Sequence, residues 1–169
     1  EGYQARIDAD YGQAISDAPR SLGRNYSAES DMGNWTSDVV RHATGVEVGL
    51  YNTGGIRADI VAGPITKMDL FEVFPFGNQV VTFELTGAEL LSILLGNAIV
   101  TSEGEGGLIP VSGATVKWRE VLGAPELVEI LVAGQPLDPD RVYRCASNSY
   151  VVEQAERYLR GASPQHPEA

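Results

Sequence analysis

The sequence predicts an α+β fold in which a mixed sheet is flanked by helices. Apolar residues recur at helical spacing in some segments and alternate with polar residues in others. The two kinds of segment do not follow the steady strand–helix–strand rhythm of a parallel α/β protein. The chain has 169 residues, of which 43% are hydrophobic and 21% charged. A chain of this length and composition can bury a core of its own.

The N-terminal segment is predicted as a helix that ends near Pro19. Its apolar residues recur every four positions, at Tyr3, Ile7, Tyr11 and Ile15. We therefore divide the chain into a linker-like helix over residues 1–19 and one domain over residues 20–169. A second apolar stripe predicts a helix over residues 32–44, which Gly45 closes as the C′ residue.

Strands and further helices follow in irregular order. Alternating or apolar runs predict strands over residues 46–51, 80–85, 111–118, 127–132 and 141–147. Thr66 with Asp69 forms a capping-box pattern that begins a short helix through about Glu72, and a second helix begins at Thr86 and runs to about Ile99. A last helix is expected over residues 151–160, and the chain from Gly161 onward is expected to fray.

The charge of the chain argues against nucleic acid and membranes as partners. Lys and Arg number 12 and Asp and Glu number 23, which gives a net charge of −11. Such a surface repels phosphate backbones and anionic lipid. The apolar runs are also far shorter than the roughly 20 residues that span a bilayer.

The stretch Asn52-Thr53-Gly54-Gly55-Ile56-Arg57 carries the strongest signal for a binding site. Its two glycines allow a positive φ or a close approach to a ligand, and Arg57 offers a planar fork of donors to an anion. Backbone N–H groups at Gly54 and Gly55 would add to such an anion site. The alternative is that Arg57 is an ordinary surface arginine after a turn.

A second unusual stretch, Phe74-Pro75-Phe76-Gly77-Asn78, follows further along the chain. Phe76 is either a core ring beside a turn or a rigid platform on which an aromatic ligand stacks. We expect this stretch and the glycine loop to belong to one pocket.

No catalytic or metal-binding motif is recognisable in the sequence. The histidines are His42, in a predicted helix, and His166, in the tail, so a two-metal hydrolase site would lack ligands. Cys145 could pair with His42 as nucleophile and base, but a cysteine in the middle of an apolar strand is typically buried. Glu29 and Asp31 could bind a metal, but acids just before a helix more often cap it. We therefore expect no catalytic residue and no metal in this chain.

An ordered set of short motifs resembles the C-terminal domain of the 5′-nucleotidase/UDP-sugar hydrolase family. The motifs are Glu29-Ser30-Asp31-Met32-Gly33-Asn34, Asn52 to Arg57, Gly63-Pro64-Ile65-Thr66, Pro75-Phe76-Gly77-Asn78, Leu85-Thr86-Gly87, Leu137-Asp138-Pro139 and Tyr143-Arg144. Their order and spacing fit the family over residues 29–150. The resemblance implies that Asn52 and Arg57 contact a nucleotide and that Phe76 and Tyr150 clamp its base.

The resemblance also implies a longer protein. In this family an N-terminal metallophosphoesterase domain holds two divalent metal ions, and the C-terminal domain grips the nucleoside and positions its phosphate. We therefore expect the substrate-recognition domain of a periplasmic or extracellular 5′-nucleotidase-type hydrolase, inactive without its own N-terminal domain. The alternatives are a non-catalytic nucleotide-binding or interaction module and a relative that hydrolyses UDP-sugars or cyclic nucleotides.

The sequence departs from the family pattern at two places. Tyr26 stands where the family usually has an arginine, with Arg24 two residues away. After Tyr150 the family's Gly-Gly-Asp-Gly loop is replaced by Glu153-Gln154-Ala155-Glu156, which has a helical pattern.

Overall fold

A mixed five-stranded sheet forms the centre of the computed structural model, which describes residues 11–104 and 107–169. The strand order is β10-β4-β9-β2-β5. The strands are β2 (Val48–Leu50), β4 (Val80–Thr86), β5 (Val111–Ser112), β9 (Val142–Asn148) and β10 (Gln165–Glu168). β2 and β9 are parallel, whereas the other neighbouring pairs are antiparallel. The predicted α+β fold with a mixed sheet flanked by helices is confirmed.

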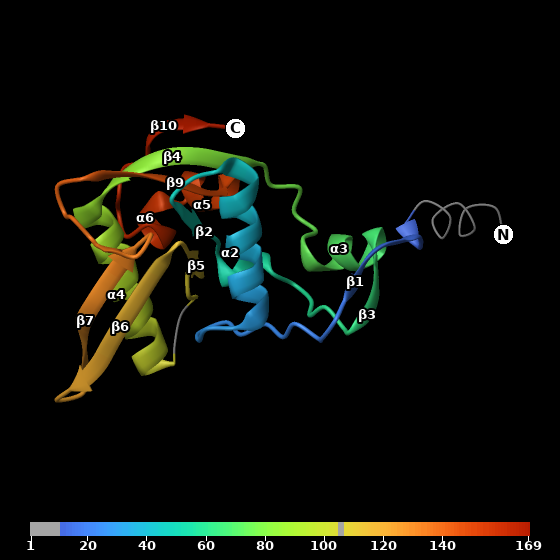
Figure 1. Ribbon diagram of the computed structural model, residues 1–169, viewed down its shortest axis with the longest axis horizontal. Coiled ribbons are helices and arrows are strands. Elements are labelled where there is room, and N and C mark those ends of the chain that lie inside the picture. The colour runs from blue at the N-terminus through green and yellow to red at the C-terminus, as the bar shows by residue number, and fades with distance from the viewer. Residues whose placement is uncertain (1–10, 105–106) are drawn as a thin grey trace.

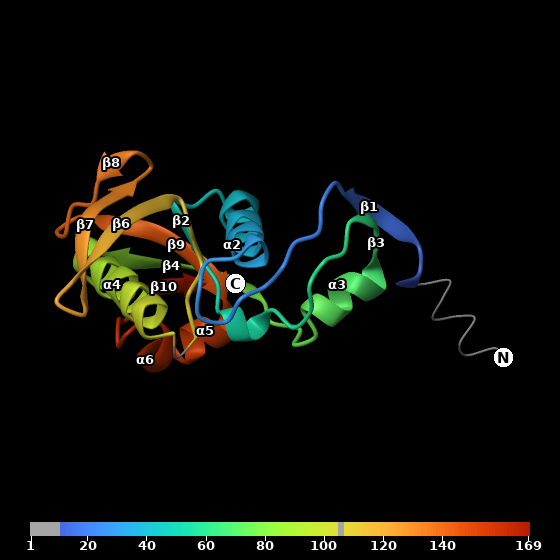
Figure 2. The same ribbon diagram turned by 90° about the horizontal axis from the view of Figure 1, so that it is seen from below.

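Helices cover both faces of this sheet. Along β9, Tyr143 and Cys145 belong to one apolar core and Ala146 to another, because successive side chains of a strand point to opposite faces. The long helix α4 (Gly87–Glu103) packs into the first core, and α2 (Asp31–Thr44) packs into the second. Figures 1 and 2 show α2 and α4 on opposite sides of the central strands. The strand ends are thereby held between two packed layers.

Two smaller sheets complete the fold. A hairpin of β6 (Ala114–Val121) and β7 (Ala124–Val132), extended by β8 (Gln135–Pro136), lies beside α4. On the other side of the molecule, β1 (Ala14–Ala18) pairs with β3 (Gly63–Thr66), and α3 (Lys67–Val73) follows directly. This second group extends away from the central sheet as an arm (Figures 1 and 2).

The predicted end of α2 and the predicted starts of α3 and α4 are confirmed, whereas α4 runs to Glu103 and not only to about Ile99. Ser30 caps α2 by accepting a hydrogen bond from the Gly33 N–H, and Gly45 ends the helix with a φ of 66°. Complete capping boxes occur at the starts of α3 and α4, formed by Thr66 with Asp69 and by Thr86 with Glu89. These local signals place helix ends well because they satisfy backbone groups that the helix itself cannot.

The predicted N-terminal helix is wrong over residues 14–18. Residues 14–18 form β1, which pairs antiparallel with β3. Tyr11 and Ile15, which share the predicted stripe, are 43% and 48% exposed and pack into neither apolar core. Their spacing therefore does not reflect a buried helix face. Tyr3 and Ile7 lie outside the described residues, and the division at residue 19 stays a prediction.

The C-terminal segment also differs from its prediction. In place of one helix there are two short ones, α5 (Ser149–Glu153) and α6 (Ala155–Tyr158), with non-helical dihedral angles at Gln154. This corner allows both Val151 and Leu159 to be fully buried in the same core. The expected frayed tail instead contains β10, which adds an edge strand to β4.

Candidate functional site

A pocket of about 370 Å³ lies where β2 and β9 end. Because these strands are parallel, their carboxyl ends meet at one edge of the sheet, where ligands are often bound in mixed α/β structures. The lining residues are Asn52, Gly54, Gly55, Phe76, Asn78, Tyr150 and Tyr158. Five of the six predicted site residues are therefore brought together. The volume lies within the range of about 300–1,000 Å³ that is usual for small-molecule sites.

The glycine loop lines the pocket and forms a short 3₁₀ turn, η1 (Thr53–Gly55). Neither Gly54 nor Gly55 has a positive φ, so that part of the sequence argument does not hold. Close approach is instead the reason for Gly55, since a Cβ atom there would lie 2.9 Å from both the Asn52 Oδ1 and a Tyr51 ring carbon. A Cβ atom at Gly54 would make only ordinary contacts, the nearest at 3.6 Å.

Two exposed aromatic rings form walls of the pocket. Phe76 is 57% exposed and comes from the turn between α3 and β4, and Tyr150 is 39% exposed and comes from α5. Large apolar rings are usually buried unless they serve a contact surface. Their exposure beside one cavity favours the ligand-stacking interpretation of Phe76 over the core-ring interpretation.

A buried amide pair joins the glycine loop to the Tyr150 wall. The Asn148 Nδ2 donates a hydrogen bond of 2.8 Å to the Asn52 Oδ1, and the Asn148 Oδ1 accepts one of 3.0 Å from the Val151 N–H. Both asparagines are at least 97% buried, with exposures of 3% for Asn52 and 2% for Asn148. Within the described part of the chain, the Asn52 Nδ2 has no hydrogen-bond acceptor, so it is available to a ligand in the pocket.

Arg57 lies at the rim rather than in the lining. Its Cζ atom is 5.9 Å from the centroid of the Phe76 ring, and its Nη1 donates a hydrogen bond of 3.3 Å to the Gly54 carbonyl. Among residues 11–104 and 107–169, no carboxylate forms a salt bridge with it. An exposed guanidinium next to an aromatic wall is suited to the anionic end of a ligand whose flat end lies on the ring.

Sequence reasoning missed two lining residues, Asn78 and Tyr158. Asn78 ends the Pro-Phe-Gly-Asn motif, so its place beside Phe76 was visible in the sequence. Tyr158 carries no local signal, because it reaches the pocket only through the corner between α5 and α6. Arg24, considered as a substitute for the arginine that Tyr26 replaces, lies with its Nε 3.6 Å from the Asp59 Oδ1.

Cys145 cannot act as a nucleophile paired with His42. The thiol is fully buried in the core on the α4 side of the sheet, whereas His42 lies on α2, which covers the opposite face. Burial, together with the negative charges of Glu47 and Glu89, raises the pKa of the Cys145 thiol to about 12. A thiol that stays protonated at neutral pH is unreactive.

The acids before α2 are engaged in local contacts. Asp31 lies in the first turn of the helix, and hydrogen bonds from Arg20 lower the pKa of its carboxyl group. Glu29 accepts a hydrogen bond of 2.8 Å from the Asn34 Nδ2. In the described parts of the chain, no group of three or more His, Cys, Asp or Glu side chains could hold a metal ion.

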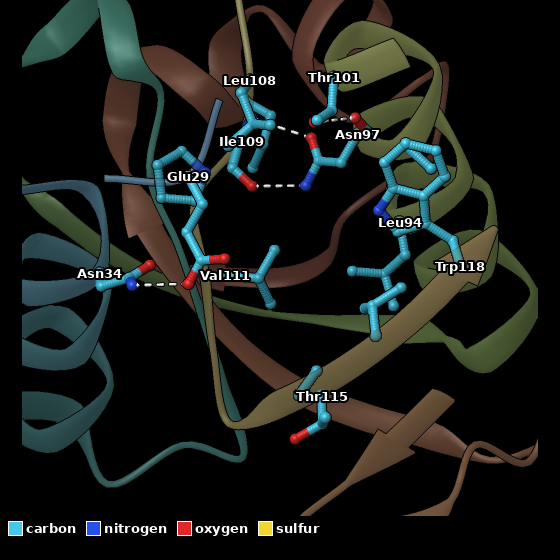
Figure 3. Close-up of a pocket in the computed structure, with 14 residues that line it drawn as sticks. Glu29, Asn34, Leu94, Asn97, Thr101, Leu108, Ile109, Val111, Thr115 and Trp118 are labelled. Carbon is cyan, nitrogen blue, oxygen red and sulfur yellow. Dashed lines mark hydrogen bonds between the residues drawn. The ribbon is translucent and has the colours of Figure 1, made fainter. Parts of the chain in front are cut away.

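A second cavity of about 380 Å³ lies between α2, α4 and β6 (Figure 3). Several of its polar groups are already paired within the protein. Asn97 uses its amide in hydrogen bonds of 2.6 and 3.0 Å with the Ile109 carbonyl and N–H, and Glu29 is held by Asn34. The pocket at Asn52 combines exposed rings with unpaired donors, so we take it as the candidate site.

Among the residues placed by the structure, no helix is long and apolar enough to cross a membrane.

The fold is a mixed-sheet α+β domain with a pocket lined by aromatic side chains at the strand ends. Residues 6–160 match the family described as 5′-nucleotidase, C-terminal domain. The chain belongs to this family, which confirms the resemblance that the sequence motifs indicated.

Known relatives agree with this assignment. The chain is 30% identical over 152 residues to "Endonuclease YhcR" of Bacillus subtilis, covering 88% of this chain and 12% of that protein. It is 30% identical over 132 residues to "Protein UshA" of Escherichia coli, covering 78% of this chain and 23% of that protein. The crystal structure of a 5′-nucleotidase precursor from Thermus thermophilus superposes with a TM-score of 0.79 at 29% identity, over 96% of this chain and 35% of that one. The chain thus spans about a third or less of the length of these relatives.

Proposed function

We propose that this chain is the substrate-recognition domain of a metal-dependent 5′-nucleotidase-type phosphoester hydrolase. It binds the nucleoside part of a nucleotide and positions the phosphate for a separate dimetal domain of the same protein. The observation that carries the proposal is one pocket with Phe76 and Tyr150 as walls, Asn52 in its lining and Arg57 at its rim. As the family resemblance implies, the proposal includes a periplasmic or extracellular location.

Each part of the pocket has a chemical task in this proposal. The Phe76 and Tyr150 rings stack on the base, an interaction worth about 1–3 kcal/mol per base. The Asn52 and Asn78 amides, which line the same pocket, offer hydrogen-bond donors and acceptors to the polar edges of the nucleoside. Arg57 forms charge-assisted hydrogen bonds to the phosphate. Held in this way, the phosphate has a fixed orientation toward the dimetal domain. Holding reacting groups in a fixed orientation supplies a large part of the rate acceleration of an enzyme.

The residues that the structure describes offer no set of ligands for the metal ions of such an enzyme. The carboxylates and histidines in its described parts form no group that could hold an ion. The proposal therefore places the ions in the other domain and assigns no step of the hydrolysis to this one.

A second candidate function uses the same pocket for a different phosphoester, a polynucleotide in place of a mononucleotide. The relative YhcR is named an endonuclease, so the same domain also occurs in a protein named for polynucleotides. The charge of −11 disfavours a long phosphate backbone as the ligand of this chain. We therefore favour a mononucleotide, and titration with a short oligonucleotide beside AMP distinguishes the two.

Calorimetric titration with AMP and adenosine tests the proposed role of Arg57. We expect AMP to bind about five- to tenfold more tightly than adenosine, because the phosphate gains a charge-assisted contact at an exposed site. In Arg57→Ala this difference should vanish while the affinity for adenosine is kept. Arg119→Ala is the matched control, since it removes the same charge from the β6–β7 hairpin. If neither AMP nor adenosine binds, the proposed function is refuted.

A further inference from the structure

Tyr158 reaches the pocket through the corner between α5 and α6. The Gln154 N–H donates a hydrogen bond of 3.0 Å to the Tyr150 carbonyl, and the Tyr158 N–H donates one of 3.0 Å to the Gln154 carbonyl. The next residue, Leu159, is completely buried in the core on the α4 side. The backbone on both sides of Tyr158 is therefore fixed, and its ring is held at the edge of the cavity.

The Tyr158 ring packs directly against the Tyr150 ring. Their centroids are 5.7 Å apart and their planes are inclined by 56°. In the part of the chain that the structure describes, Tyr158 is the only ring that pairs with Tyr150. The Cζ atom of Arg157 lies 5.2 Å from the centroid of the Tyr158 ring, on which it forms a cation–π contact. Tyr150 is thus supported by a ring that is itself held in place.

The surroundings of the Tyr158 phenol raise its pKa above the ordinary value. Burial raises its pKa, the positive charge of Arg157 opposes this effect, and Tyr150 and Tyr26 raise the pKa further. The Tyr158 ring therefore faces Tyr150 as an uncharged phenol at neutral pH.

We propose that Tyr158 is a positioning residue that fixes the Tyr150 ring as the second face of the base-binding clamp. The inference rests on the proposed function, because it assumes that Tyr150 stacks on a base. It assigns a role to the corner between α5 and α6, which holds the two rings against each other. A partly exposed ring on a five-residue helix can turn away from the ligand unless a neighbour restrains it.

A double-mutant cycle on Tyr150 and Tyr158, read by calorimetric titration with adenosine, tests this inference. We expect Tyr158→Ala to weaken binding about two- to tenfold, the range expected for loss of an aromatic pair. Tyr158→Phe should bind within about twofold of the wild type, because the ring and not the hydroxyl supports Tyr150. In the Tyr150→Ala background, Tyr158→Ala should cause no further loss, since the coupled partner is already absent.

Each other outcome overturns the inference. Equal affinity of Tyr158→Ala and the wild type would show that Tyr150 needs no support. Equal losses with and without Tyr150 would show that Tyr158 acts independently of it, and a loss in Tyr158→Phe as large as in Tyr158→Ala would assign the effect to the hydroxyl. Phe76→Ala in the same series separates the two proposals. If Phe76→Ala binds adenosine like the wild type, the base-binding clamp itself is wrong. If Phe76→Ala loses affinity and Tyr158→Ala does not, only the proposed role of Tyr158 is wrong. Circular dichroism confirms that each variant is folded.

Discussion

Replacing Phe76 with alanine is expected to weaken adenosine binding about tenfold to a hundredfold while the fold stays intact. The loss follows from stacking between base and aromatic ring, which is worth about 1–3 kcal/mol. Phe76 is 57% exposed, so its removal leaves little cavity, and the free energy of unfolding should change by less than about 1 kcal/mol. Calorimetric titration gives the affinity, and urea denaturation gives the stability.

Phe71 provides a matched control for this experiment. It is 58% exposed, lies on α3 of the same arm and does not line the pocket. Phe71→Ala should therefore bind adenosine like the wild type. If both variants lose affinity equally, the effect comes from the arm in general, and the specific role of Phe76 is refuted.

Replacing Asn148 with alanine is expected to cost about 2–4 kcal/mol in the free energy of unfolding. The variant leaves the Asn52 Oδ1 and the Val151 N–H without their hydrogen-bond partner in a buried region, and each such group costs about 1–3 kcal/mol. The hydrogen bond to the Val151 N–H is also the N-cap of α5, which carries Tyr150. The affinity for adenosine should fall as well, because Asn52 and Tyr150 both lose their fixed positions.

Asn34→Ala is the corresponding control for stability. Asn34 also donates through its side-chain amide, but its hydrogen bond to Glu29 is exposed. We expect this variant to lose less than about 1 kcal/mol and to bind adenosine normally. Urea denaturation of both variants measures the comparison, and similar stabilities for Asn148→Ala and the wild type would show that the amide pair does not hold the site together.

Features that depend on short stretches of chain could be predicted from the sequence. The capping boxes at Thr66 and Thr86 and the left-handed Gly45 are set by neighbouring backbone groups, so the sequence alone places them. The glycine loop and the Phe76 turn are likewise local, and the structure brings them to one pocket. Binding of a ligand by these residues stays a proposal.

Features that depend on distant pairing could not be predicted. β1 is a strand because residues 63–66 offer it a pairing edge, and β10 exists because β4 leaves an edge open. The apolar spacing of Tyr11 and Ile15 suggested a helix because spacing carries no information about partners far along the chain. Tyr158 was missed for the same reason, since its place in the pocket depends on how α6 folds back after Gln154.

Amide chemical shifts recorded during a titration with AMP test the central claim most directly. The account predicts changes at Gly55, Arg57, Phe76 and Tyr150, all at the pocket where β2 and β9 end. Asn97 and Thr115, which line the second cavity, serve as an internal reference and should not shift. Saturable shifts confined to the first set would support nucleotide recognition at this pocket, whereas shifts confined to the second set, or none at all, would contradict it.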